Sequence, residues 1–263
     1  CTMKYTSLMV LTLALAASVS AAAPTPPAIN ISDNATTMLK THKAQIAKRV
    51  SYWKDYVLNA ASAKEVTSAC TMILSRSDMF RTTNTDYRNA YGAEVAKQFG
   101  PLLSAKAMPK TNTPDLKWTK QINAAILFSR IAQPTTLPVQ LKMLTSPKAS
   151  MRLLALRGLL RQKQNLFRGS KPPFTSAAMT LTTMLPKETN PLVLAACGNL
   201  LDMTKTDAKS LPASTKATVG KQCDTLMSLL VVQLRVLLDD EDLGYRPDAV
   251  TIAMTAKDVL ITI

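Results

Sequence analysis

The chain has 263 residues and a formal net charge of +15 at pH 7. Only 7 residues are glycine and 5% are aromatic, which is too few for the turns and strand pairs of a β-sandwich or β-barrel. We therefore expect an all-α protein. Its length allows one elongated domain or two small ones.

The first 21 residues have the three parts of a secretory signal peptide. A short positive start after Met3 precedes an apolar run over residues 8–17, and small residues lead to a Val-x-Ala site that ends at Ala21. We expect cleavage after Ala21 and a secreted or periplasmic mature chain, with Cys1 and Thr2 preceding the start. An uncleaved anchor is the alternative, but it needs about 20 apolar residues. No later segment is long and apolar enough to span a membrane.

Residues 22–34 contain three prolines and no apolar periodicity, which predicts a flexible linker. Asn30 and Asn34 each begin an Asn-x-Ser/Thr triplet. These triplets would be glycosylation sites in a eukaryotic secretory route. Whether the protein is bacterial or eukaryotic stays open.

Residues 35–107 have the spacing of an N-terminal helical region. Apolar residues recur every three, four and seven positions over 35–61, which predicts one long helix. Ser62 and Glu65 form a capping box that begins a second helix. The third helix ends at a Gly-Pro pair and carries a stripe at intervals of four: Tyr87, Tyr91, Val95 and Phe99.

A polar connector, residues 108–114, separates this region from a second helical half, residues 115–263. Positive charge is concentrated in the middle of the chain, where residues 111–210 contain 14 Lys and Arg but only 4 Asp and Glu. Such an excess favours an acidic partner. The apolar end at Ile263 lacks the polar cap of a terminal repeat, so we expect the chain to be truncated there.

Residues 137–160 resemble a HEAT repeat. A first helix with regularly spaced leucines leads to a Ser-Pro turn at Ser146, and a second helix begins with an apolar-Arg pair and contains small residues that allow helices to approach closely. A weaker copy follows about 40 residues later, with Gly198 matching Gly158. The similarity covers residues 116–201 and implies a HEAT-like α-solenoid of stacked antiparallel helix pairs, with an irregular helical bundle as the alternative.

Basic residues gather on the second helix of the better repeat and in the loop after it. Arg157 and Arg161 are four positions apart and therefore share a helix face. This candidate partner-binding surface comprises Arg152, Arg157, Arg161, Lys163, Arg168 and Lys171. A basic edge that serves only solubility is the alternative interpretation.

Three cysteines remain after the signal peptide, and an exported protein would allow two of them to pair. Cys197 and Cys223 lie on helices that we expect to be neighbours, so they are the first candidates for a disulfide. Any of the three pairings remains open, as does a chain with buried thiols only.

The sequence contains no recognisable catalytic or metal-binding motif, so we expect neither an active site nor a cofactor. His42 is the only histidine, and no Cys-x-x-Cys or His-Glu-x-x-His occurs. The acidic residues at 239–242 resemble the start of a calcium loop, but Leu243 and Val250 stand where oxygen ligands are required. We interpret this segment as a solvated turn.

These features predict a non-catalytic binding or scaffold protein that presents a basic surface to an acidic protein or an envelope polyanion. One alternative is a non-catalytic part of an enzyme whose catalytic domain lies beyond the chain end or on a partner. Another is a HEAT-like protein that binds nucleic acid, which export would disfavour. The sequence does not predict an oligomeric state.

Overall fold

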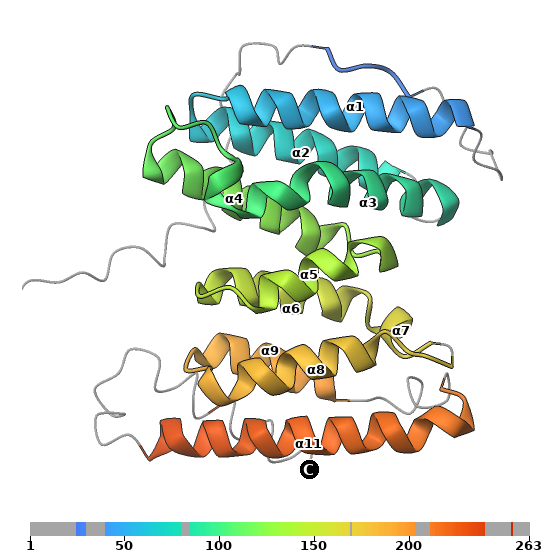
Figure 1. The fold of residues 1–263 in the computed structure, drawn as a ribbon, viewed down its shortest axis with the longest axis vertical. Coiled ribbons are helices and arrows are strands. Elements are labelled where there is room, and N and C mark those ends of the chain that lie inside the picture. Colours follow the sequence, from blue (N-terminus) through green and yellow to red (C-terminus); the bar gives the residue numbers. More distant parts are fainter. Residues whose placement is uncertain are drawn as a thin grey trace, which may run out of the picture.

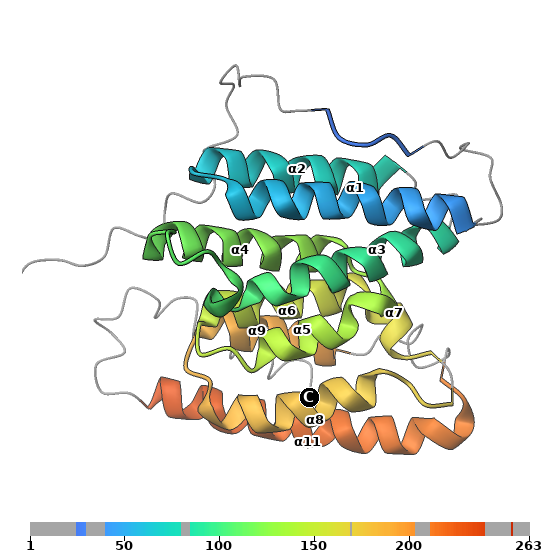
Figure 2. The same ribbon diagram turned by 45° about the horizontal axis from the view of Figure 1, so that its top comes forward.

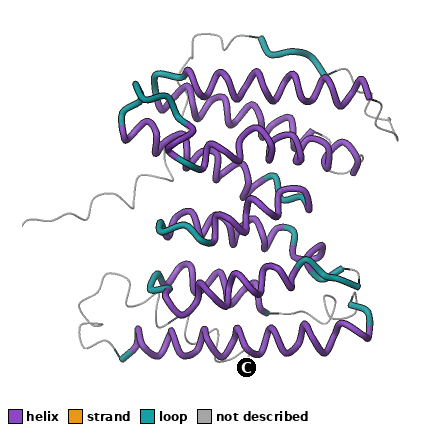
Figure 3. Tube along the Cα trace, in the orientation of Figure 1, coloured by secondary structure: helices purple, strands orange, loops and turns teal. Residues whose placement is uncertain are grey.

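The structure, a computed structural model, describes residues 25–29, 40–79, 85–168, 170–202, 211–239 and Met254. Within these ranges the chain forms helices and short connections, with no β-strand (Figure 3). The expected all-α class is therefore confirmed. The predicted signal peptide, both glycosylation triplets and most of the acidic segment lie outside the described residues, as do residues 240–253 and 255–263 of the predicted second helical half. No helix in the described ranges has the length and apolar character needed to cross a membrane.

The first two helices form where the apolar spacing predicted them. Helix α1, Lys40–Asn59, buries the stripe of Ile46, Val50, Trp53 and Val57. Helix α2, Ala63–Met79, begins with the predicted capping box, in which the Glu65 backbone N–H donates to Ser62 Oγ and the Ser62 N–H donates to Glu65 Oε2, both at 3.3 Å. The capping box is confirmed, and it defines the turn between the two helices.

Helix α3, Thr85–Phe99, packs its predicted aromatic face inward. Tyr87 and Tyr91 stack with ring centroids 5.7 Å apart, and the Tyr91 hydroxyl donates to the Ile73 carbonyl of α2 at 3.0 Å. At the Gly-Pro pair the chain changes to the short 3₁₀ helices η1, Gly100–Leu103, and η2, Ala105–Ala107.

Helix α4, Pro114–Arg130, begins with Thr113 as its N-cap and proline in its first turn, a combination that favours helix initiation. Its Lys120 is fully buried, which the sequence analysis did not anticipate. The Lys120 ammonium donates to the Leu58 carbonyl at 2.8 Å and so joins α4 to the end of α1. Burial lowers the pKa of Lys120, while the nearby Glu65 charge acts in the opposite direction.

The helix pairs of the second half also occur where they were predicted. After η3, Pro134–Thr136, the Ser-Pro turn connects α5, Leu137–Leu144, with α6, Ala149–Arg161. The one-turn helix α7, Lys163–Leu166, leads to α8, Phe174–Met184, and η4, Leu185–Lys187. Asn190 caps α9, Pro191–Leu201, and the long helix α11, Ala213–Leu238, follows it.

The helices stack in chain order from α1 to α11 (Figure 1). Contacts run from α2 to α4, from α4 to α6 and from α6 to α9. On the other side of the stack α1 contacts α3, and α5 contacts α8, while α11 covers both α8 and α9. In the turned view of Figure 2, α1 and α2 again lie at one end of the stack and α11 at the other.

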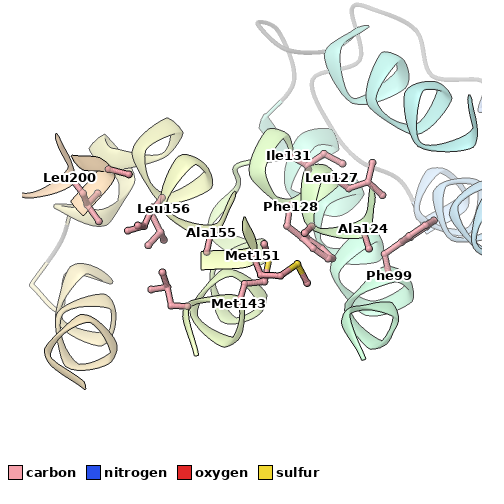
Figure 4. Packing of buried hydrophobic residues seen from close by; sticks show 14 of the residues in the cluster. Phe99, Ala124, Leu127, Phe128, Ile131, Met143, Met151, Ala155, Leu156 and Leu200 are labelled. Atoms are coloured by element: carbon pink, nitrogen blue, oxygen red, sulfur yellow. The ribbon is translucent and has the colours of Figure 1, made fainter. Parts of the chain in front are cut away.

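A continuous apolar core connects neighbouring layers, and Figure 4 shows the part between Phe99 and Leu200. Gly158 is buried where α6 meets α4. A Cβ at this position would lie only 2.5 Å from Gln140 Nε2 and 3.0 Å from the Phe128 carbonyl oxygen. A methyl group would fit only if the Gln140 amide and the Phe128 carbonyl moved, so Gly158 allows the close helix approach that was predicted for it.

Part of the expected linker is instead packed against the helices. Residues 25–29 lie beside α1 and α2, and Ile29 is only 5% exposed. The guanidinium of Arg49 donates to the Pro27 carbonyl at 2.9 Å, and that of Arg76 donates to the Ile29 carbonyl at 2.8 Å. Side chains far along the sequence therefore hold the backbone of this part of the predicted linker.

Candidate functional site: the basic surface of α6 and the following loop

Helix α6 is enclosed on most sides, and this determines which of its residues a partner can reach. It contacts α4, α5 and α9, and Leu156 and Leu159 are fully buried. The side facing away from these contacts carries Leu154, which is half-buried, and the exposed residues Arg157 and Arg161. Spacings of three and four residues place all three on one stripe of the helix.

The two arginines on this stripe are exposed to solvent. Neither Arg157 nor Arg161 forms an ion pair with a carboxylate in the described part of the chain. Arg161 lies in the last turn of α6, where its positive charge interacts favourably with the negative end of the helix dipole. The chain then continues through α7 into a loop that exposes Arg168 and Lys171. We use the name basic surface for Arg157, Arg161, Arg168 and Lys171.

Arg152 does not belong to this surface, which corrects the prediction from sequence. Its Nε and Nη2 donate to the two carboxylate oxygens of Glu188 at 2.5 and 2.8 Å, and its Nη1 donates to the Ser146 carbonyl at 2.8 Å. The Arg152 side chain is 14% exposed and that of Glu188 is not exposed at all. The Asn190 N–H also donates to Glu188. Arg152 therefore joins the start of α6 to the turn before α9 instead of facing a partner.

Glu188 was not predicted as a functional or structural residue, although the sequence contained a signal. It is the only carboxylate between Asp115 and Asp202, in a stretch rich in Lys and Arg. A single acid among many basic residues is expected to pair with one of them in the fold. Which basic residue it pairs with depends on a contact between residues 36 positions apart. Periodicity does not report contacts of that range.

Lys163 is half-buried and directed toward the end of α9. Its ammonium donates to the Asn199 carbonyl at 3.4 Å and to the Asp202 carbonyl. Carbonyls in the last turn of a helix have no partner within the helix, so a lysine there stabilises the helix end. Lys163 thus acts within the fold and is not part of the basic surface.

The candidate disulfide between Cys197 and Cys223 is not present in the structure. Their helices α9 and α11 do contact each other, as expected, but Cys70, Cys197 and Cys223 are all thiols. Burial raises the pKa of Cys223 to about 11 and that of Cys70 to about 12, and it also raises the pKa of Cys197. These thiols are therefore protonated at neutral pH and react slowly.

A second basic feature, not predicted from sequence, lies at the opposite end of α6. The Lys148 ammonium sits 3.4 Å from the centroid of the Trp118 ring, a cation–π contact. Both residues line a hollow of about 390 Å³ together with Lys142 and Met151. The neutral ring does not cancel the ammonium charge, so this hollow is a second cationic feature beside the start of α6.

Residues considered for catalysis do not converge in the described part of the chain. His42 lies half-buried on α1. No group of three His, Cys, Asp or Glu side chains in the described residues could hold a metal ion.

Comparisons with protein-family models, with curated proteins and with solved structures found no match to this chain.

Proposed function

We propose that the chain is an exported HEAT-like α-solenoid that binds an acidic protein or an envelope polyanion through its basic surface, without catalysis. Support for the repeat arrangement comes from the helix pairs α5–α6 and α8–α9, which follow each other at the expected spacing. The Arg152–Glu188 ion pair connects one pair to the next. Repeats stacked in this way present long surfaces rather than deep pockets, which suits binding.

One observation carries the proposal of an acidic partner. Arg157 and Arg161 are exposed on the single open side of a helix that is otherwise packed, and no described carboxylate neutralises them. Guanidinium groups form bidentate contacts with carboxylates and phosphates, and they are more weakly hydrated than ammonium groups. Leu154 on the same stripe adds an apolar contact beside the charges.

Charge reversal on this stripe tests the proposal. We expect the double variant Arg157→Glu, Arg161→Glu to elute from an anionic matrix at a much lower salt concentration than the unchanged protein, since attraction between exposed charges is screened by salt. A loss of net charge alone would also weaken retention. The matched control is therefore Lys40→Glu, Lys48→Glu, which makes the same change in net charge on exposed residues of α1.

The two double variants separate the alternatives. If the basic surface is the binding site, the α6 variant loses retention and the α1 variant keeps most of it. Equal losses would contradict the proposal, because retention would then follow net charge and not a defined surface. Circular dichroism of both variants excludes unfolding as the cause.

A further inference from the structure

The segment 25–29 lies along α1 and α2 at the end of the stack (Figure 2). Two of its carbonyls, two residues apart, each accept a hydrogen bond from a different helix. Arg49 of α1 donates to the Pro27 carbonyl at 2.9 Å, and Arg76 of α2 donates to the Ile29 carbonyl at 2.8 Å. The two arginines therefore hold the backbone of the segment and not its side chains.

One side chain of the segment is also held. Ile29 is 5% exposed and belongs to the main apolar core, whereas the neighbouring Ala28 is exposed. Pro26 and Pro27 are half-buried and bring their own restriction, because proline rings favour an extended backbone and lack an N–H that would need a partner. Recognition thus consists of an extended backbone, two carbonyls and one aliphatic anchor.

We propose that the outer side of α1 and α2, at the end of the stack, is a binding site for an extended, proline-containing peptide with an aliphatic residue two positions after its last proline. Residues 25–29 occupy this site in cis. Every residue has a carbonyl, so Arg49 and Arg76 select a conformation, and the aliphatic anchor supplies specificity. The site shares no residue with the basic surface. An experiment on this site therefore tests the peptide-binding inference separately from the proposed function.

The covalent connection explains how the site stays occupied. The segment reaches α1 through residues 30–39. A short connection of this kind gives an effective concentration on the order of millimolar, so a free peptide at micromolar concentration does not compete with it. A change that removes the anchor in cis should open the site to a peptide in trans.

The experiment uses the full chain with Ile29→Asp and a fluorescent peptide of residues 22–31. We expect the peptide to bind this variant at least tenfold more tightly than it binds the unchanged protein, as measured by fluorescence anisotropy. A chain with Ala28→Asp is the matched protein control. Because Ala28 is exposed, this chain should keep its own segment in place and behave as the unchanged protein.

Changes in the peptide test the contacts without altering the fold of the protein. A peptide carrying Ile29→Asp should not bind the opened site, whereas a peptide carrying Ala28→Asp should bind normally. Adding Arg49→Gln and Arg76→Gln to the opened chain should weaken binding at least tenfold. The inference is overturned if the opened chain does not bind the unchanged peptide. It is also overturned if the unchanged protein binds the peptide as tightly as the opened chain does.

Discussion

Replacing Gly158 by alanine tests how closely α6 and α4 approach each other. In a typical helix this substitution stabilises by about 1 kcal/mol, because alanine has the higher helix propensity. Here the new methyl group would lie 2.5 Å from Gln140 Nε2 and 3.0 Å from the Phe128 carbonyl oxygen. It would displace the Gln140 amide, which donates to that carbonyl at 2.8 Å and also accepts a hydrogen bond from Gln162.

The structure predicts that the steric cost exceeds the gain in propensity. Overpacking costs about 1–3 kcal/mol, and a buried amide that loses its partner costs about 1–3 kcal/mol more. After the gain in propensity is subtracted, we expect a net loss of about 3 kcal/mol, which lowers Tm by about 6–12 °C in a chain of this size. Urea and thermal unfolding followed by circular dichroism measure both quantities.

Gly220 provides the matched control within the same protein. It lies inside α11, and a Cβ added there would meet no atom within 4 Å. Gly220→Ala should therefore stabilise by up to about 1 kcal/mol, so the two substitutions should have opposite signs. A Gly158→Ala variant as stable as Gly220→Ala would refute the close approach of α6 to α4.

Three further predictions concern the ion pair, the thiols and the N-terminus. Arg152→Ala or Glu188→Ala alone should lower the free energy of unfolding by about 3–5 kcal/mol, because each leaves the charge of its partner without a counter-charge. The double variant should lose less than the sum of the two single losses. Additive losses, measured by urea unfolding, would count against a direct ion pair. The raised pKa values of Cys70 and Cys223 mean that the folded state favours their protonated forms. The stability that this contributes should be lost as pH rises from about 9 toward 12. A urea midpoint that does not fall over this range would contradict the prediction. Mass spectrometry of protein expressed from Met3 in cells that export it should find Ala22 as the first residue, and a retained Met3 would refute cleavage.

The helices themselves could be predicted from sequence because local patterns determine them. The stripe of Ile46, Val50 and Trp53 repeats with the period of a helix, and the capping box at Ser62 uses atoms only three residues apart. The Ser-Pro turn between α5 and α6 is a local signal of the same kind.

Long-range polar contacts could not be predicted, and they account for the errors. Arg152 and Arg157 were both predicted to belong to the basic surface, yet Arg152 pairs with Glu188, which is 36 residues away in the sequence. Arg49 of α1 likewise donates to the Pro27 carbonyl, which lies 22 residues away in the sequence. In both cases the partner lies in a segment without periodicity, so only the tertiary structure identifies it.

The basic surface was predicted in part. Four of its six predicted residues are exposed. Arg157 and Arg161 lie opposite the leucine stripe of a packed helix and so face solvent, whereas Arg168 and Lys171 lie in the loop that follows α7. Arg152 and Lys163 instead join neighbouring helices through a carboxylate and through backbone carbonyls. The basic residues of a helical repeat can thus either connect repeats or face a partner, and residue type alone does not distinguish the two roles.

The salt concentration at which the chain elutes from an anionic matrix tests the central claim most directly. For Arg157→Glu, Arg161→Glu, we predict elution well below that of Lys40→Glu, Lys48→Glu, although both variants carry the same net charge. Elution of the two variants at the same salt concentration would contradict a binding surface on α6.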